Sequence, residues 1–176
     1  MYALVRHAHA GDKKAWTGPD ERRPLSRRGQ QQAEGIAGTL SAMAVTRLVS
    51  SPYLRCVQSL QPLAARLNLP IQTSEHLGPD ATAAELDALL ADPAMEGAVL
   101  CTHGETLKAL LARWQDRRLL EVAAASGRDD GHSTEKGATW IVETESESRT
   151  IHYLRPVEVG PSLRTGANTW PEMPVG

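Results

Sequence analysis

The sequence predicts an α/β fold with three layers: a mostly parallel sheet flanked by helices, and a C-terminal antiparallel hairpin. Short apolar runs alternate along the chain with longer segments of helical periodicity, which is the order typical of parallel sheets. Two segments near the C-terminus alternate apolar and polar residues, as strands with one covered face do. The 176 residues suit a single domain, and no repeat or second domain is visible.

The N-terminal part is expected to contain a strand, a long loop and a helix. Tyr2–Val5 is an apolar run that stops abruptly at Arg6, as a buried strand does when it reaches the edge of a sheet. Residues 9–24 are rich in Gly, Pro and charge, so we expect a long loop there. Ser26 is a typical helix cap, and apolar residues at helical spacing predict a helix that extends to Met43.

The middle of the chain is expected to form two short strands and two helices. Arg47–Ser50 is the first of these strands, and the helix after it, within SSPYLRCVQSLQPLAARL, places its apolar residues on one face. Pro62 falls inside this pattern, so we expect it to bend the helix or to lie near its first turns. Pro70–Thr73 can form the next short strand, and a third helix is expected from Thr82.

The C-terminal part repeats the arrangement of the N-terminus and then changes character. Ala98–Thr102 is an apolar run that ends at His103, and the segment GETLKALLARW after it has helical spacing. The expected hairpin pairs residues 138–145 with residues 149–154. Residues 156–176 lack periodicity, and we expect an irregular tail there after a domain of residues 1–155.

Composition and charge argue against several classes of protein. Hydrophobic residues make up 41% and charged residues 23%, as in ordinary globular proteins. A net charge of -2 and a pI near 6.3 give no overall attraction to nucleic acid or to anionic membranes. The N-terminus resembles no signal peptide, so we expect a cytoplasmic protein with neither nucleic acid nor membrane as a partner. Cys56 and Cys101 lie in apolar stretches and are not expected to form a disulfide.

Polar side chains follow three of the predicted strands at equivalent points. These are the pair Arg6–His7, the segment from Ser51 to Arg55, and the segment from Thr102 to Gly104. Because ligands bind outside the carboxyl ends of strands in open α/β sheets, we expect two Arg and two His side chains to share one pocket. Guanidinium groups match tetrahedral oxyanions, and a helix N-terminus adds backbone N–H donors. The pattern therefore predicts a phosphoryl-binding site.

An imidazole in such a pocket can attack phosphorus and form a covalent intermediate. Cationic neighbours lower its basicity and keep it neutral at physiological pH. The arginines and the second imidazole would stabilise charge on the transferring oxygens. The sequence thus predicts a phosphatase that works without a metal ion or another cofactor.

Three motifs resemble those of the histidine phosphatase superfamily: VRHAHA, SSPYLR and THGE. The resemblance spans roughly residues 2–155, and Ala8 stands where the family signature Arg-His-Gly has its glycine. It implies that His7 is the nucleophile that becomes phosphorylated and that Arg6 and Arg55 bind the phosphoryl group. It also implies that His103 is the second catalytic histidine.

Within the family, the chain is similar to the short SixA-like branch of phosphohistidine phosphatases. The segment RRPLSRRG resembles a motif of that branch, which implies Arg23 as an additional substrate contact. The link from Arg55 to His103 is short, whereas larger members insert a substrate-capping region there. An open site suits a phosphorylated protein, and phosphohistidine is the first substrate choice. A small phosphorylated metabolite, such as a nucleotide or sugar phosphate, is the alternative.

The general acid is the one part of the family pattern without a clear match. Mutase-like members place an acidic residue between the second and third motifs, where this chain has Glu75, Asp80 and Glu85. The first two are kept as substrate-binding candidates. His9 and Glu105 flank the expected pocket and could also serve. Because phosphoimidazole needs less protonation than an alkoxide leaving group, a missing acid would favour phosphohistidine as substrate.

Two other classes of protein compete with this interpretation. His7 and His9 resemble the metal-binding pair of barrel hydrolases, but such barrels need about 200 or more residues and further ligands. The other class is a binding module that holds phosphate without turnover. The presence of a complete nucleophile argues against it.

Overall fold

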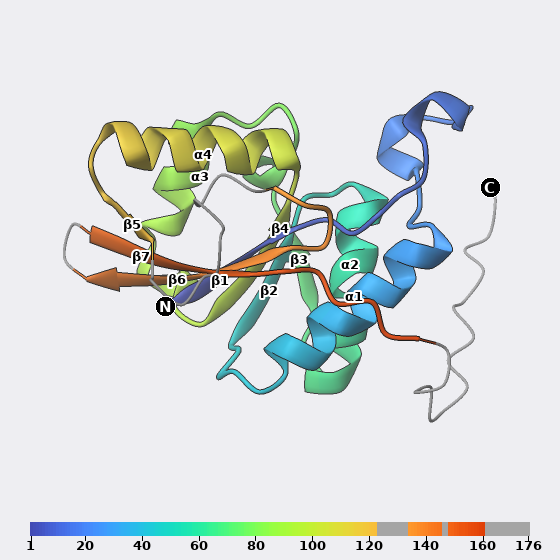
Figure 1. Cartoon of the computed structure of the whole chain (residues 1–176), viewed down its shortest axis with the longest axis horizontal. Helices are drawn as coiled ribbons and strands as arrows, with labels where there is room; N and C mark the ends of the chain where they lie inside the picture. Colours follow the sequence, from blue (N-terminus) through green and yellow to red (C-terminus); the bar gives the residue numbers. More distant parts are fainter. Residues whose placement is uncertain (123–133, 146–147, 161–176) are drawn as a thin grey trace.

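The computed structural model describes residues 1–122, 134–145 and 148–160, and a seven-stranded sheet runs through its centre (Figure 1). The order of strands across the sheet is β3-β2-β4-β1-β6-β7-β5. Their bounds are β1 Tyr2–Arg6, β2 Arg47–Ser50, β3 Ile71–Thr73, β4 Ala98–Thr102, β5 Leu120–Val122, β6 Thr139–Glu145 and β7 Ser148–Leu154. The strands predicted from apolar runs are all present.

The four strands β1 to β4 form one parallel part of the sheet, and β5 and β7 form another parallel pair. β1 and β2 both pair with the central strand β4, and β3 pairs with β2, always in parallel. The register places Arg6 opposite Thr102 and Ser50 opposite Cys101. The carboxyl ends of three neighbouring strands therefore meet at one edge of the sheet.

Four α-helices cover the two faces of the sheet. They are α1 (Arg27–Leu40), α2 (Leu54–Leu67), α3 (Ala83–Leu90) and α4 (Gly104–Asp116). Figure 1 shows α3 and α4 above the sheet and α1 and α2 below it. Two separate apolar clusters fill the spaces between these layers. The prediction of a three-layer α/β fold is confirmed.

Side-chain alternation along β1 explains why both faces carry a core. Tyr2 and Leu4 pack into the cluster under α3 and α4, whereas Ala3 and Val5 pack into the cluster above α1 and α2. This is the period of two that a strand imposes. A strand buried on both faces has a continuous apolar sequence, and the apolar run at the N-terminus therefore predicts β1.

The predicted helix starts are accurate in two cases where a side chain caps the helix. Ser26 accepts a hydrogen bond from Gly29 N before α1, and Thr82 accepts one from Glu85 N before α3. Pro62 lies inside α2 and is buried, rather than in the first turns of the helix. Short 3-10 turns occur at η1 (Lys13–Ala15), η2 (Asp20–Arg22), η3 (Glu75–Leu77) and η4 (Pro93–Met95).

The C-terminal hairpin is confirmed, and one edge strand was not expected. β6 pairs antiparallel with both β1 and β7, and β5 then pairs with β7 at the edge of the sheet. Of the expected tail, residues 156–160 are irregular and run beside α1, where Val159 N donates to the carbonyl oxygen of Gln31. Residues 161–176 lie outside the described part of the chain. Within the described ranges, no helix has the length and apolar character needed to cross a membrane.

Candidate active site

Side chains from the ends of β1, β2 and β4 converge at one edge of the sheet. Arg6 is the last residue of β1, and His7 follows it with its backbone N–H bonded to the carbonyl oxygen of Thr102 at 2.9 Å. His103 follows β4 as the residue before α4. Arg55 comes from the first turn of α2, directly after β2. The structure thus brings together the four side chains that the three motifs predicted.

His7 is buried, with 6% of its surface exposed, and its orientation is fixed by its own backbone. Its Nδ1 lies 2.8 Å from the carbonyl oxygen of Ala8. Because a carbonyl oxygen only accepts, Nδ1 carries the proton and Nε2 keeps its lone pair. Burial lowers the pKa of His7 well below 6.5, and the charges of His103, Arg55 and Arg6 lower it further. His7 is therefore a neutral imidazole at physiological pH.

His103 stands beside His7 and is held by groups on both of its nitrogens. The two rings meet edge to face, with centroids 5.3 Å apart. Arg55 Nη2 lies 3.4 Å from His103 Nδ1, and Ser51 Oγ lies 2.9 Å from His103 Nε2. Since a guanidinium only donates, Nδ1 accepts and Nε2 carries the proton towards Ser51. The ring of Tyr53 packs edge to face against His103 at 4.9 Å.

Arg55 is the most enclosed cation of the pocket, with 4% of its surface exposed. Its guanidinium lies over the ring of Tyr53, 4.6 Å from the centroid. Its Nη1 donates to the carbonyl oxygen of Asp20 at 2.7 Å, and its Nη2 donates to Asp20 Oδ2 at 3.1 Å. Within the described chain, its buried Nε has no hydrogen-bond partner. That N–H is a free donor for an incoming oxyanion.

Arg6 lies flat against the start of α4 because residue 104 is glycine. A Cβ atom on Gly104 would come within 2.6 Å of Arg6 Cζ. Arg6 Nη1 donates to the carbonyl oxygen of Thr134, while its buried Nε is unpaired in the described part of the chain. Burial lowers the pKa of Arg6, and the charge of Glu105 opposes this shift.

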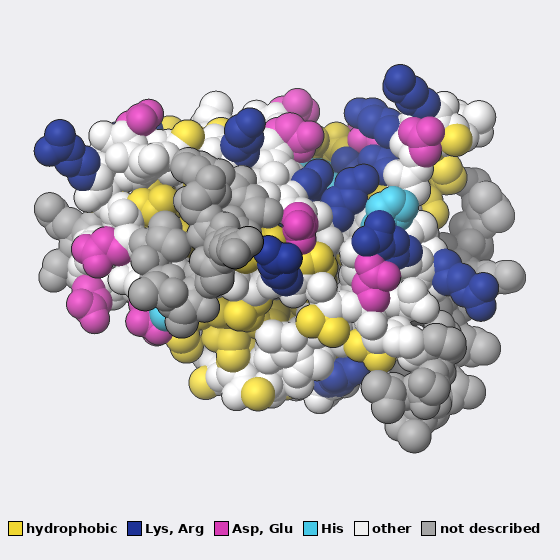
Figure 2. Space-filling model, in the orientation of Figure 1, with side chains coloured by type: hydrophobic (Ala, Val, Ile, Leu, Met, Phe, Trp, Pro, Cys, Tyr) yellow, Lys and Arg dark blue, Asp and Glu magenta, His cyan; other side chains and the backbone are white. Residues whose placement is uncertain are grey.

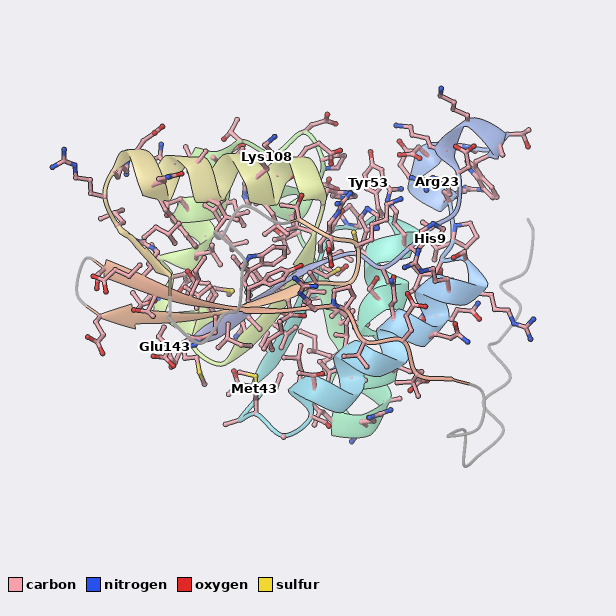
Figure 3. The ribbon with its side chains drawn as sticks, in the orientation of Figure 1. His9, Arg23, Met43, Tyr53, Lys108 and Glu143 are labelled. Carbon is pink, nitrogen blue, oxygen red and sulfur yellow. The ribbon has the colours of Figure 1, made fainter. Side chains whose placement is uncertain are left out.

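Arg23, the additional contact expected from the sequence, is buried beside the four side chains. Its Nη1 donates to the carbonyl oxygen of Ala10 at 2.7 Å, and its Nε donates to Asp20 Oδ1 at 2.9 Å. Asp20 therefore joins Arg23 to Arg55. Figure 3 shows Arg23, Tyr53 and His9 at the same end of the molecule.

None of the acidic candidates has a hydrogen bond or ion pair with Arg6, His7, Arg55 or His103 in the described chain. Glu85 caps α3, where its Oε2 accepts from Thr82 N at 2.9 Å. Glu75 begins η3 and is exposed, and Asp80 is exposed as well. Asp80 still lies near enough to Tyr53 to help raise its pKa, after burial and the charge of Glu21.

The two residues that flank the pocket have different surroundings. His9 Nδ1 lies 2.7 Å from Ser26 Oγ, which ties the ring to the cap of α1. Glu105 is exposed in the first turn of α4. Among the residues that the structure describes, no group of three or more His, Cys, Asp or Glu side chains is placed to hold a metal ion.

Sequence reasoning missed two charged residues at this site, Asp20 and Lys136. The spacing of Asp20 and Arg23 in a loop was the available signal for the first. Lys136 precedes Gly137, whose N–H bonds to the carbonyl oxygens of Arg6 and His7 at 3.2 Å. Burial lowers the pKa of Lys136, and nearby cations lower it further. These cations are Arg6, Arg23, Arg28 and Arg55.

The surface at this end of the molecule carries the same excess of positive charge. Figure 2 shows Lys and Arg side chains gathered there around a His side chain. The overall charge of the chain is slightly negative, so this cationic area is local. Guanidinium and imidazole groups clustered in this way suit a tetrahedral oxyanion such as a phosphoryl group.

An α/β sheet with two His and two Arg side chains at one edge defines a class of oxyanion-binding proteins. Residues 2–78 match the sequence model of the histidine phosphatase superfamily (branch 1). The N-terminal part of the chain is thus similar to this superfamily. The matched region contains Arg6, His7 and Arg55, and the fold adds His103 to them.

One curated relative is similar over most of the chain. The 8-oxo-(d)GTP phosphatase of Mycolicibacterium smegmatis is 32% identical over 159 residues, which cover 87% of this chain and 47% of that protein. The chain thus spans about half the length of this relative.

Solved structures show the same fold. The protein histidine phosphatase SixA in complex with tungstate has a TM-score of 0.67 and 22% identity, covering 85% of this chain and 92% of that one. For the SixA structure from Agrobacterium tumefaciens, the TM-score is 0.69 and the identity 20%, covering 88% and 97%.

Proposed function

We propose that this protein is a phosphatase in which His7 attacks phosphorus and becomes transiently phosphorylated. The observation that carries this proposal is the state of His7. Its ring is buried and neutral, its Nδ1 proton is held by the Ala8 carbonyl, and its Nε2 has no hydrogen-bond partner among the described residues. A nucleophile in this state needs no proton removed before it attacks.

The reaction has two displacement steps. In the first, the Nε2 lone pair of His7 forms a bond to phosphorus, and the bond from phosphorus to the leaving group breaks. In the second, water attacks the phosphorus of phospho-His7, the P–N bond breaks, and inorganic phosphate leaves. Nε2 regains its lone pair, so the enzyme returns to its starting state.

Arg6, Arg55 and His103 stabilise the charge on the three phosphoryl oxygens during both steps. The buried, unpaired Nε donors of Arg6 and Arg55 support this role, because a bound oxyanion would give each of them a partner. Guanidinium groups fixed in place before the reaction cost no reorganisation when charge develops. They supply positive charge that a metal ion would otherwise bring.

The favoured substrate is phosphohistidine on a protein. The chain from α2 to β4 holds β3 and α3, and α3 packs with α4 into the core rather than forming a cap over the pocket. No acidic candidate from the sequence contacts the four pocket side chains in the described chain. Asp20 does contact Arg55, but its pKa is lowered: burial raises it, and Arg23, Arg55 and Lys13 outweigh that effect. A leaving imidazole tolerates such a site better than an alkoxide does.

A nucleotide phosphate is the second candidate, and two observations favour it. The relative from Mycolicibacterium smegmatis bears the name 8-oxo-(d)GTP phosphatase. Lys136 adds a cation beside the pocket, and it has no ion pair within the described residues. This charge exceeds what a single phosphoryl group requires and would suit a second one.

A substrate panel tests the proposal and separates the two candidates. The wild type and His7→Asn are compared on a phosphohistidine protein, nucleoside mono-, di- and triphosphates, sugar phosphates and an aryl phosphate. We expect release of phosphate by the wild type alone, with the highest kcat/KM for phosphohistidine. A preference for nucleotides would select the second candidate. Equal, background release by both proteins on every substrate would contradict phosphatase function.

A further inference from the structure

The carboxylate of Asp20 pairs with the guanidinium groups of two arginines at the site. Its Oδ2 accepts from Arg55 Nη2 at 3.1 Å, and its Oδ1 accepts from Arg23 Nε at 2.9 Å. Its backbone carbonyl accepts from Arg55 Nη1 at 2.7 Å, and Lys13 Nζ lies 3.6 Å from Oδ2. One carboxylate thus binds both Arg55 and Arg23.

A buried guanidinium requires an anionic or strongly polar partner. Arg55 is 4% exposed and Arg23 is 7% exposed, and Asp20 is the carboxylate that neutralises them. Carboxylate and phosphoryl oxygens suit the same guanidinium fork. The side chain that stabilises Arg55 in the free protein is therefore of the same chemical kind as the expected ligand.

The carboxylate and a bound phosphoryl group cannot both hold Arg55 without repulsion. Asp20 is ionised at neutral pH, because its contacts with Arg23 and Arg55 favour the charged form. Two anions within a few ångströms of each other in a partly buried site repel strongly. A phosphoryl dianion attracts the arginines more than a carboxylate does, so it can displace Asp20.

Asp20 lies in a segment whose two 3-10 turns, η1 and η2, contain no buried residue. It begins η2, and residues 12–19 before it are all exposed. The indole N–H of Trp16 bonds to the carbonyl oxygen of Pro19, and Asp12 caps η1, so the segment is folded on itself. Two hydrogen bonds, both between Asp20 and Arg55, connect this segment to the pocket.

We propose that Asp20 is an internal competitor of the phosphoryl group, whose displacement from Arg55 by the ligand undocks residues 12–22 from the pocket. The inference rests on the proposed phosphate pocket, but not on turnover. Competition by Asp20 would make the open site selective among anions. Anions that bind arginine no better than a carboxylate leave the loop in place, and a phosphoryl dianion opens it.

Titration with inorganic phosphate alone tests this inference. Asp20→Asn removes the competing charge, and we expect its affinity for phosphate to exceed that of the wild type by about tenfold. Glu21→Gln is the matched control, since it removes the neighbouring charge from an exposed side chain without a contact to Arg55. Its affinity should stay within about twofold of the wild type.

Trp16 fluorescence reports the position of the loop in the same titration. We expect a phosphate-dependent change in the wild type that is absent in Trp16→Phe. In Asp20→Asn, the fluorescence without phosphate should already resemble that of the phosphate-bound wild type. Trypsin cleavage after Lys13 and Lys14 should rise in parallel, because both lie in the exposed segment.

The outcomes are distinct. If Asp20→Asn binds phosphate equally or more weakly than the wild type, Asp20 orients Arg55 and the inference is wrong. Phosphate binding without any change at Trp16 or in trypsin cleavage also overturns it, as does a lack of binding by both proteins. Phosphate binding with loop release, but no hydrolysis of any substrate in the panel, would support the inference and reject the proposed phosphatase function.

Discussion

The surroundings of His7 make its protonation matter for folding as well as for the proposed reaction. Its pKa lies well below 6.5 because the ring is buried and has cationic neighbours. The unfolded chain therefore binds a proton at this side chain below pH 6.5, where the folded protein does not yet bind one. Stability from this group is present above pH 6.5 and decreases as the pH falls below that value.

We predict that replacing His7 by Gln removes this part of the pH dependence. Below pH 6.5, the free energy of unfolding of the wild type should fall by about 1.4 kcal/mol per pH unit more than that of the variant. Urea unfolding of both proteins between pH 7.5 and pH 5 measures the difference. A constant difference across this range would show that His7 titrates as an ordinary exposed histidine.

Gly104 is the second residue whose environment makes a direct prediction. A methyl group there would come within 2.6 Å of Arg6 Cζ and displace the guanidinium from the start of α4. We expect Gly104→Ala to lower kcat/KM by about a hundredfold, the lower end of the range seen when a charge-stabilising donor is lost. Gly38→Ala in α1 is the control, because its Cβ has space. Activity that is unchanged in Gly104→Ala would contradict the placement of Arg6.

At the scale of elements, Asp87 joins α3, α4 and β7. Its Oδ2 accepts from Arg113 Nε at 3.1 Å, its Oδ1 accepts from the indole of Trp114 at 2.7 Å, and Arg149 lies 3.5 Å from Oδ1. These contacts lie at the opposite end of α4 from His103. Ten residues separate Gly104 from Trp114, which is about 15 Å along a helix.

We predict that Asp87→Asn reduces stability but not activity. Loss of the charge should lower the free energy of unfolding by about 1 to 3 kcal/mol, as for other hydrogen bonds that involve a charged group. Chemical denaturation measures this loss, and steady-state kinetics on the same samples should give an unchanged kcat/KM. A large fall in kcat/KM at full folding would mean that α3 contributes to the active site directly.

The strands and helices that could be predicted from the sequence are those whose structure follows from a single physical rule. A strand buried on both faces must be apolar throughout, as in Ala98–Thr102, and Ser26 and Thr82 each cap a helix by a local hydrogen bond. β5, Leu120–Val122, was missed. Its position comes from pairing with β7, a long-range contact.

At the scale of the whole molecule, the topology determined which parts of the site were predictable. Arg6, His7, Arg55 and His103 follow strands or begin helices, so the order of the sheet brings them together. Asp20 comes from an irregular loop, and its place depends on side-chain contacts with Arg55 that no periodicity encodes. Sequence reasoning therefore placed His7 and the arginines beside it, whereas the carboxylate that balances their charge required the structure.

The identity of the phosphorylated residue is the most direct test of the proposed function. The protein is mixed with excess substrate, quenched in alkali to preserve a P–N bond, digested and analysed by mass spectrometry. We expect one transient phosphoryl group on His7, which is absent from His7→Asn and accumulates during turnover. Turnover with a phosphoryl group on another residue, or with none on His7 at any time, would contradict it.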